Sequence, residues 1–348
     1  MKTILVTGGS GFIGSHTCIS LIENGYSLIV VDSNINSSEI SLERVKHICK
    51  KKLLVPSISF QKGDIRNKEF LIKIFSESTK ANKSIDGVIH FAGLKSVEES
   101  VLNPLKYWDN NVLGSMCLFQ VMNEFNCRTI VFSSSATIYG GNSLLPFEES
   151  SPIKPLNPYG HTKASIECLL KDLYGSAKDS WRVANLRYFN PVGAHPSGLI
   201  GENPLNIPNN LFPYICKVAL GIYKELKIFG NNWPTKDGTC IRDYIHVMDL
   251  ADAHVSALNY LSRSKAQLIE FNIGTGLGTS VLEIVEKFMM INNCKIPYVF
   301  CERRLGDVPE IIANNKKAIS LLKWKPKRDL EDMCKDGWKW QKNNPNGF

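Results

Sequence analysis

The feature that most constrains the fold is a set of three glycines close to the start of the chain. Gly8, Gly11 and Gly14 are spaced three residues apart and follow the apolar run Ile4–Thr7 directly. This spacing suits a strand that turns tightly into a helix and brings backbone N–H groups close to a pyrophosphate. Asp32 stands about 20 residues further on, where an acid can accept hydrogen bonds from an adenosine ribose. The pattern predicts a dinucleotide-binding unit.

Strand-like and helix-like segments alternate, most regularly in the first half of the chain. This alternation indicates βαβ units and a parallel sheet, with ligands bound beyond the carboxyl ends of its strands. We therefore predict an α/β fold: a Rossmann-type doubly wound parallel sheet with a smaller mixed α/β substrate-binding domain. The expected strands are Ile4–Thr7, Leu28–Val31, Ile58–Gln61, Gly87–Phe91, Thr129–Phe132, Val183–Leu186 and Glu270–Ile273, and the expected helices are Gly11–Asn24, Pro104–Phe125, Tyr159–Leu173 and Val247–Leu261.

The character of the sequence changes after residue 189. The run Asn190–Asn210 carries several Pro, Gly and Asn residues and predicts irregular structure. We place a domain boundary there, with a cofactor-binding Rossmann domain at 1–189 and a substrate-binding domain at 190–348. Parts of 240–275 are expected to pack back on the first domain.

Composition limits the remaining classes of function. The chain of 348 residues has a net charge of +8, but its lysines are dispersed and the densest run, Lys50–Lys52, is short. We therefore expect no nucleic-acid partner. The leading apolar run is too short for a signal sequence and no segment could span a bilayer, so we expect a cytoplasmic protein with no membrane partner. Ten scattered cysteines and seven histidines form no metal-spaced pair, which predicts reduced thiols and no metal site.

Residues at the expected strand ends indicate which dinucleotide binds. The carboxylate of Asp32 would repel a 2′-phosphate and no arginine is adjacent, which favours NAD over NADP. Asp64 and Ile65 follow the third strand and are suited to the adenine edge. The residues Phe91–Gly93 follow the fourth strand, where they would flank the cofactor.

Tyr159 and Lys163 predict the reaction chemistry. Their spacing places both side chains on one face of a helix, and Ser133–Ser135 end the preceding strand, so their hydroxyls are expected to face the same cleft. Hydride removal from a carbinol requires a base for the hydroxyl proton, whereas a free phenol has a pKa of about 10. Lys163 and a positive nicotinamide would stabilise the phenolate. Lowering its pKa by roughly three units corresponds to about 4 kcal/mol.

These motifs resemble those of extended short-chain dehydrogenase/reductases, and the chain is similar to UDP-galactose 4-epimerases from residue 1 to about residue 347. The resemblance implies reversible, NAD-dependent 4-epimerisation of UDP-galactose and UDP-glucose, an activity of galactose metabolism, by a homodimer. Hydride would leave sugar carbon 4 for a permanently bound NAD and return to the other face of a 4-keto sugar. The similar segments are Val6–His16, His90–Lys95, Ser133–Gly140, Arg187–Ser197, Ile207–Leu211 and Asp237–Leu250.

The resemblance also implies roles for single residues. Tyr159 would be the general base and acid, Lys163 would lower its pKa and hold the nicotinamide ribose, and Ser135 would assist at the 4-hydroxyl. The implied cofactor-binding residues are Gly8, Gly11, Phe12, Ile13, Gly14, Asp32, Asn36, Asp64, Ile65, Phe91, Ala92, Gly93, Lys95, Asn110, Ser133, Tyr159, Lys163 and Tyr188. The implied substrate-binding residues are Lys95, Ser135, Tyr159, Asn190, Asn210, Phe229, Arg242, Tyr244, Arg304, Asp307 and Ile311.

Within the substrate group, Phe229 would lie against uracil, Arg242 and Arg304 would clasp the diphosphate, and Asp307 would hold the uridine ribose. One nearby position departs from the family. Cys240 stands where these enzymes usually carry glycine, and a positive φ there would strain the approach to Arg242.

Two further positions depart from the family pattern. His161–Thr162 stand where bacterial and animal epimerases often carry Lys-Ser, and we expect little effect because these side chains point away from the catalytic face. Ile311 aligns with the position that admits or excludes N-acetylated sugars in the family. Because Ile is of intermediate size, we expect a strong preference for UDP-glucose and UDP-galactose over UDP-N-acetylhexosamines.

Three alternatives compete with this hypothesis. The chain could also act as a UDP-N-acetylhexosamine 4-epimerase. It could be a nucleotide-sugar 4,6-dehydratase, but such enzymes carry Asp-Glu after the strand-five hydroxyl, where this chain has Ala136–Thr137. It could be a non-enzymatic NAD-binding regulator on the same fold. Such proteins usually lose the catalytic Tyr or Lys, and both are present here.

Overall fold

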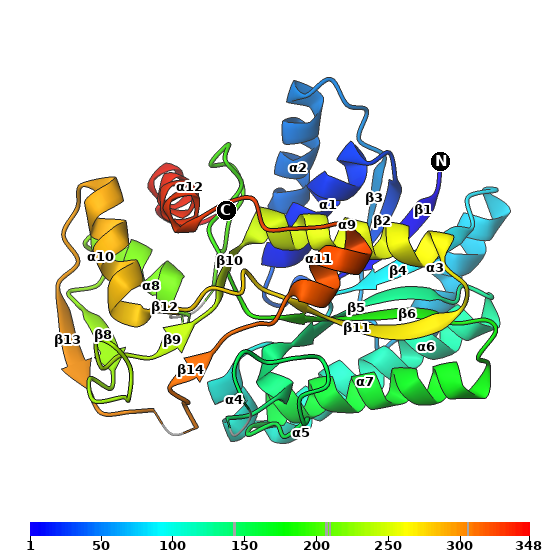
Figure 1. The fold of residues 1–348 in the computed structure, drawn as a ribbon. Coiled ribbons are helices and arrows are strands. Elements are labelled where there is room, and N and C mark those ends of the chain that lie inside the picture. The colour runs from blue at the N-terminus through cyan, green and yellow to red at the C-terminus, as the bar shows by residue number, and fades with distance from the viewer. Residues whose placement is uncertain (142–143, 206–207, 209, 305) are drawn as a thin grey trace.

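The computed structural model describes the chain except for residues 142–143, 206–207, 209 and 305 (Figure 1). The similar segment Ile207–Leu211 therefore lies partly outside the described residues. The centre of the molecule is a parallel sheet in the order β11-β6-β5-β4-β1-β2-β3. Because the order reverses between β1 and β4, the predicted doubly wound Rossmann-type sheet is confirmed. The strands are β1 (Thr3–Thr7), β2 (Ser27–Asp32), β3 (Ile58–Lys62), β4 (Ile85–His90), β5 (Thr129–Ser135), β6 (Arg182–Tyr188) and β11 (Gln267–Ile273).

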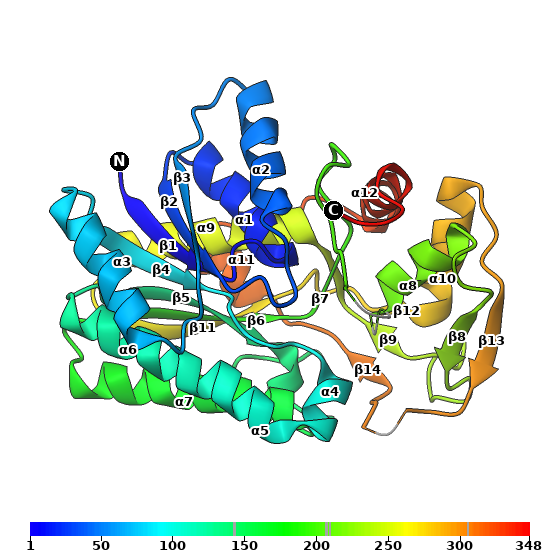
Figure 2. The ribbon, with the colours of Figure 1, turned by 180° about the vertical axis from the view of Figure 1, so that it is seen from behind.

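Helices cover both faces of this sheet (Figures 1 and 2). Apolar side chains of the strands pack against helices on either side and form two hydrophobic cores. A parallel sheet needs this double cover because both of its faces are apolar. One face carries α1 (Phe12–Glu23), α2 (Ile40–Lys51), α9 (Val247–Arg263) and α11 (Lys316–Leu322), and the other carries α3 (Lys68–Lys80), α6 (Gly114–Glu124) and α7 (Pro158–Ser176).

The helix predicted at Pro104–Phe125 is less regular than its sequence pattern indicates. It follows α4 (Val97–Leu102) and consists of α5 (Pro104–Tyr107), a π-helical turn η1 (Trp108–Leu113) and then α6. A π turn is wider than an α turn and changes the direction in which side chains leave the helix.

The second half of the chain builds a smaller unit beyond the carboxyl ends of the sheet strands (Figure 1). Asn190–Val192 forms a strand that pairs in parallel with Tyr244–His246, so the prediction of irregular structure over Asn190–Asn210 is wrong for its first three residues. The pairing depends on a partner more than 50 residues away, which no local pattern reveals. The elements are β7 (Asn190–Val192), β8 (Leu226–Phe229), β9 (Ile241–Arg242), β10 (Tyr244–His246), β12 (Thr279–Ser280), β13 (Tyr298–Cys301), β14 (Glu310–Ile311), α8 (Leu211–Ala219), α10 (Val281–Asn292) and α12 (Leu330–Asn343).

Two elements from the second half lie in the layers of the main sheet. Strand β11 pairs with β6 along its whole length, and α9 packs against α1. The segment after α11 is fixed to α9 through Asp249. The Asp249 carboxylate accepts hydrogen bonds from the backbone nitrogens of Lys327 and Arg328, both at 2.9 Å, and forms an ion pair with the Arg328 guanidinium at 2.5 Å.

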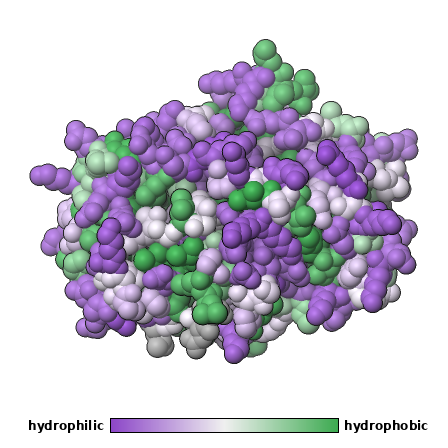
Figure 3. All heavy atoms as spheres, in the orientation of Figure 1, coloured by the Kyte–Doolittle hydropathy of each residue, from purple (hydrophilic) through white to green (hydrophobic). Residues whose placement is uncertain are grey.

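The surface gives no sign of a membrane span. Within the described residues no helix is long and apolar enough to cross a bilayer. The face shown in Figure 3 is largely hydrophilic, with apolar side chains in scattered patches. The same part of the chain contains no group of three His, Cys, Asp or Glu side chains arranged to hold a metal ion.

The ion pair of Asp249 is the basis of a stability prediction. We expect Asp249→Asn to lower the free energy of unfolding by about 2–4 kcal/mol, because the fully buried carboxylate accepts two backbone hydrogen bonds and pairs with Arg328, and a neutral amide cannot replace all three contacts. Urea unfolding followed by circular dichroism measures the change. Glu331→Gln removes a carboxylate from the exposed pair with Lys335 and should leave stability unchanged. Equal losses in the two variants would contradict the prediction.

Candidate functional site

The glycine turn after β1 is too tightly packed for side chains at two of its positions. Gly8 has a φ of 70°, and a Cβ there would lie 2.6 Å from the backbone nitrogen of Ala92. A Cβ on Gly14 would lie 2.3 Å from the carbonyl oxygen of Gly8, so α1 can approach β1 this closely only with glycine. A Cβ on Gly11 would meet only that same carbonyl, at 3.3 Å, which leaves the outer side of the turn open.

The N-terminus of α1 and the carboxylate of Asp32 lie beside this turn. Gly11 is the N-cap residue and no side chain caps the helix, so its first N–H groups and partial positive charge remain for an anion. Asp32 ends β2 and is 7% exposed. Its carboxylate accepts hydrogen bonds from the backbone nitrogens of Ser10 and Asn34, at 3.1 and 3.0 Å, and from Ser37 Oγ at 2.8 Å.

The other predicted cofactor residues of the first half follow successive strands. Asp64, after β3, forms an ion pair with Arg66 at 2.6 Å, and the hydrogen bond from Arg66 lowers the pKa of Asp64. The backbone nitrogens of Phe91 and Ala92, after β4, both donate to the carbonyl oxygen of Thr7, at 2.9 and 3.1 Å. Of the remaining residues, Ile65 is buried, Phe12, Ile13, Gly93 and Asn110 are partly buried, and Asn36 and Lys95 are exposed.

Tyr159 and Lys163 lie one turn apart on α7, beside the end of β5. The helix begins here because the side chain of Asn157 caps it and a proline occupies its first position. Lys163 is buried, and its Nζ donates to the carbonyl oxygen of Ser133 at 2.7 Å. The same Nζ lies 6.0 Å from the centre of the Tyr159 ring. Burial lowers the pKa of Lys163 to about 8.

Ser135 ends β5 next to the phenol of Tyr159. Burial raises the pKa of Tyr159, and a hydrogen bond with Ser135 lowers it by a smaller amount. Ser135 Oγ also lies 2.8 Å from Thr137 Oγ1 in the short 3-10 helix η2 (Ala136–Ile138). The phenol is therefore neutral at neutral pH in this structure, and its ionisation depends on positive charge nearby.

Ser134 does not share the cleft with its two neighbours. Its hydroxyl is buried and donates to Oε1 of Glu167 on α7, at 2.5 Å. Successive residues of a strand face opposite sides, so only alternate side chains of the run Ser133–Ser135 can point into one cleft. The expectation that all three hydroxyls face the cleft is wrong for this residue.

Tyr188 ends β6 and forms a neutral pair with a histidine of α9. Its hydroxyl donates to His254 Nε2 at 2.5 Å, while His254 Nδ1 donates to the carbonyl oxygen of Leu250 at 2.8 Å. Burial raises the pKa of Tyr188 and lowers the pKa of His254 to about 3. The Tyr188–His254 pair is therefore uncharged at neutral pH, and Tyr188 lies close to Tyr159.

Most predicted substrate residues of the second half gather around β9 and β14. One nitrogen of Arg242 donates to three backbone carbonyls, and another lies 3.7 Å from the Asp307 carboxylate. The guanidinium of Arg304 stacks 3.8 Å from the centre of the Phe229 ring. Ile311 pairs with Arg242 across the parallel strands β14 and β9.

A glutamate that the sequence analysis missed joins two other predicted residues. Lys95 Nζ and Asn210 Nδ2 both donate to Oε1 of Glu202, at 2.6 and 2.9 Å. Asn190 and Tyr244 lie opposite each other across β7 and β10. No motif marks Glu202, because Lys95, one of its two partners, is more than 100 residues away in sequence.

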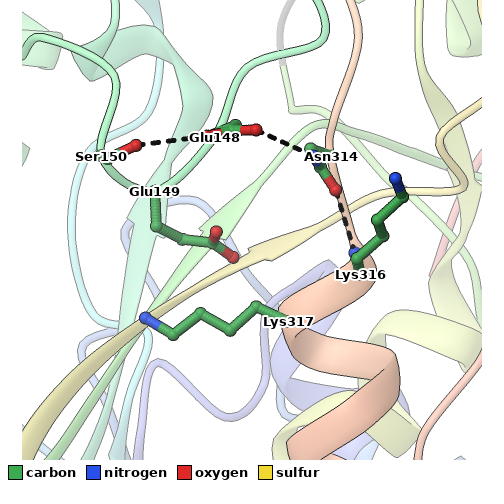
Figure 4. A pocket seen from close by; sticks show the side chains of 6 residues that line it. All are labelled: Glu148, Glu149, Ser150, Asn314, Lys316 and Lys317. Carbon is green, nitrogen blue, oxygen red and sulfur yellow. Dashed lines mark hydrogen bonds between the residues drawn. The ribbon is translucent and has the colours of Figure 1, made fainter.

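A pocket of about 320 Å³ lies elsewhere, between a loop and the start of α11 (Figure 4). Within its lining, Asn314 Nδ2 donates to Glu148, and Ser150 Oγ donates to the same carboxylate. No predicted site residue lines it, so it does not compete with the strand-end site. Its lining consists of Glu148, Glu149, Ser150, Asn314, Lys316 and Lys317.

Comparisons with known proteins agree with this geometry. The family described as GDP-mannose 4,6 dehydratase matches residues 5–337. The chain is 50% identical to UDP-glucose 4-epimerase 2 of Arabidopsis thaliana, over 100% of this chain and 97% of the relative. It is 49% identical to UDP-glucose 4-epimerase of Bacillus subtilis, over 99% and 98%. The chain belongs to the UDP-glucose 4-epimerase family.

Solved structures of the epimerase family have the same fold. The enzyme of Stenotrophomonas maltophila, with bound NAD and formylated UDP-arabinopyranose, has a TM-score of 0.94 and 43% identity, with 99% of each chain covered. The enzyme of Bifidobacterium longum, in complex with NAD+ and UDP, has a TM-score of 0.93 and 44% identity, with 100% of each chain covered.

Two departures from the epimerase pattern have a structural explanation. Cys240 is buried and does not have a positive φ, so the expected strain beside Arg242 is absent. Thr162 is buried and contributes two hydrogen bonds: its Oγ1 donates to the carbonyl oxygen of Tyr159 at 2.7 Å and accepts from Asn111 Nδ2 at 3.1 Å.

Asn111 is a second residue that the sequence analysis missed in favour of its neighbour Asn110. It lies in the π turn η1, and its side chain accepts from the backbone nitrogen of Leu94 at 2.8 Å and donates to the Leu94 carbonyl at 3.1 Å. Asn111 thereby joins the loop after β4 to the helix that carries Tyr159. The doublet of asparagines is the only sequence signal, and it does not distinguish the two positions.

Proposed function

We propose that this chain interconverts UDP-galactose and UDP-glucose by inverting the 4-hydroxyl of the hexose, with NAD bound throughout the cycle. The observation that carries the proposal is the meeting of the open glycine turn and the Tyr159–Lys163–Ser135 group at one edge of the sheet. The names of the relatives and the ligands of the two similar structures support the same assignment. The activity would belong to galactose metabolism.

The residues around the glycine turn fit NAD. The open side of Gly11 and the uncapped N-terminus of α1 suit a pyrophosphate, and the fixed carboxylate of Asp32 suits a ribose hydroxyl and would repel a 2′-phosphate. NAD, when bound, accepts a hydride from sugar carbon 4 and can return it to the opposite face of the ring.

The side chains of the cleft would move the proton. Tyr159 takes the proton of the 4-hydroxyl and later returns it, while Ser135 hydrogen-bonds the same oxygen. Because burial raises the pKa of Tyr159, its phenolate needs the positive charge of Lys163. With a pKa of about 8, Lys163 is mostly charged at neutral pH and loses this charge as the pH rises through that value.

We assign NAD to residues 1–189 and the UDP-hexose to residues 190–348. Phe229 would lie against uracil, and Arg242 and Arg304 would bind the diphosphate. Arg304 stacks on the Phe229 ring, and Arg242 lies beside Asp307, which follows Arg304 by three residues. A dehydratase would need a carboxylic acid after Ser135, whereas this chain has an alanine and a threonine there. The presence of both Tyr159 and Lys163 argues against a regulator without activity.

Substitution of the phenol tests the proposed function. We expect Tyr159→Phe to lower kcat for UDP-galactose by at least about a thousandfold, because the variant lacks the phenol that is the proposed base for the 4-hydroxyl. Conversion is followed without added reductant, and NAD released on denaturation shows that the cofactor is retained. Tyr174→Phe, on the same helix, should keep full activity. An active Tyr159→Phe enzyme would overturn the proposal.

Side-chain size at position 311 is proposed to exclude N-acetylated sugars. Ile311 packs against an apolar cluster that includes Ala136 and Phe189, next to the end of β5. We expect the wild-type enzyme to turn over UDP-N-acetylglucosamine poorly and Ile311→Ser to improve it at least about tenfold, because a smaller side chain makes room for an acetamido group. Comparison of kcat/KM for both sugars measures the effect. Equal turnover of the two sugars by the wild type would refute it.

The chain is proposed to form a homodimer in the cytoplasm, where its ten free thiols would stay reduced. Val101, Leu102 and Leu105 are exposed by 60, 73 and 81% on α4 and α5, beside α6 and α7 (Figure 2). An apolar area of this kind on a helical face is typical of a subunit interface, and a second copy of the same face would cover it.

A charge in this face tests the dimer. We expect the wild-type chain to sediment with about twice its 39.0 kDa mass and Leu105→Asp to sediment as a monomer. Burial of an aspartate carboxylate in the interface, without an opposite charge or a hydrogen-bond donor, would cost too much free energy. Leu53→Asp, at an equally exposed leucine far from this face, should remain dimeric. A monomeric wild-type chain would contradict the proposal.

A further inference from the structure

A buried ion pair lies directly behind the catalytic face of α7. Glu167 follows Lys163 by one helical turn, and its carboxylate receives Arg187 Nη2 at 2.6 Å, Arg187 Nε at 3.0 Å and Ser134 Oγ at 2.5 Å. Both charged side chains are about 5% exposed. A buried pair is weak evidence for stability, because apolar residues of similar volume often serve equally well. Its presence here calls for another role.

The pair fastens α7 to the sheet at the point where the chemistry takes place. The last residues of β5 each contact this helix: Ser133 through Lys163, Ser134 through Glu167, and Ser135 through Tyr159. The helix can therefore neither rotate nor slide without breaking one of these bonds.

Arg187 extends the network to the neighbouring strand β11. Its Nη1 donates to the hydroxyl of Tyr139 at 3.0 Å and to the carbonyl oxygen of Glu149 at 2.8 Å. Tyr139 in turn donates to Asn272 Oδ1, on β11, at 2.6 Å. The Arg187 guanidinium is thus held in place by groups outside the proposed catalytic cleft. Its ion pair in turn fixes the position of the Glu167 carboxylate.

Glu167 is the carboxylate that acts on the charge of Lys163. Burial lowers the pKa of Lys163, and the negative charge of Glu167 raises it. The other titratable groups around the amine are Tyr159 on α7, His90 on β4 and Tyr188 on β6. Burial lowers the pKa of His90 to about 3 and raises the pKa of Tyr188, so both are neutral at neutral pH.

We propose that Glu167 is a positioning residue for the epimerisation, and that Arg187 and Ser134 hold its carboxylate where it keeps Lys163 charged and the Tyr159 face of α7 fixed on β5. The kinetic part of this inference rests on the proposed function. The charge of Lys163 does not, and it can be measured without substrate.

The direct test is the titration of Lys163 itself. In protein with 13Cε-labelled lysine, the Lys163 resonance is the one missing from Lys163→Arg, and its pH midpoint is recorded. We expect Glu167→Gln to lower that midpoint by at least about half a pH unit, because the charge that favours the ammonium form is lost. Asp172→Asn, at an exposed position of α7, should leave it unchanged. An unchanged midpoint in Glu167→Gln would overturn the proposal.

The pH profile of kcat gives the kinetic test. In Glu167→Gln the alkaline limb should move to lower pH by the same amount. Because half a pH unit near the Lys163 midpoint roughly halves the charged fraction, kcat at pH 8 should fall at least about twofold with KM within about threefold. Asp249→Asn disrupts a different buried ion pair and serves as the structural control, with lower stability and an unmoved limb. If Glu167→Gln behaves like Asp249→Asn, the residue is structural only and the proposal fails.

A second variant covers the case in which an unpaired Arg187 prevents folding. The double variant Glu167→Gln/Arg187→Met removes both charges, which is often tolerated. Its Lys163 midpoint should lie below that of the wild type but above that of Glu167→Gln, because the positive charge of Arg187 is removed as well. A midpoint equal to that of the wild type would refute the inference. If the wild-type enzyme did not convert UDP-galactose, the proposed function would be refuted, but the titration result for Lys163 would still hold.

Discussion

The attachment of α7 to the last residues of β5 is the interaction on which the rest of the site depends. Lys163 reaches the carbonyl oxygen of Ser133, and Glu167 reaches the hydroxyl of Ser134, so two successive turns of the helix are bonded to two successive residues of the strand. Tyr159 lies one turn before Lys163 on the same helix, so these two bonds also fix the position of its backbone. The glycine turn, which is packed against Ala92 just after the neighbouring strand β4, stands at the same edge of the sheet. The proposed base and the proposed cofactor site are thereby kept in one fixed relation.

Burial decides the charge of nearly every group around this edge. His90, Tyr188 and His254 are neutral because an apolar environment disfavours their charged forms. Lys163 shares that environment, but a carboxylate one turn away opposes the desolvation. At neutral pH, Lys163 is therefore mostly charged while these three neighbours are neutral, and its positive charge can stabilise the phenolate form of Tyr159.

The elements with strong local signals were predictable from the sequence. β1, β2 and α1 follow from short apolar runs and glycine spacing, and the helix that carries Tyr159 follows from its own periodicity. The family resemblance named most of the site residues, although their roles remain proposals. Glu202 and Asn111 were missed, because each bonds to a residue of another segment of the chain. The π turn was missed because no residue pattern distinguishes it from an α-helical turn. The hydroxyl of Ser134 was misplaced for a simpler reason, the alternation of side chains along a strand.

Strand β11 crosses from the second half of the chain to complete the main sheet beside β6. A fragment that ended at residue 189 would therefore leave the whole hydrogen-bonding edge of β6 without its neighbour, and it would also lack α9, which covers α1. Such an edge invites pairing with other chains. The two halves differ in the ligands proposed for them, yet the first half cannot complete its sheet without a strand from the second. Synthesis must therefore continue past residue 273, where β11 ends, before the main sheet can be complete.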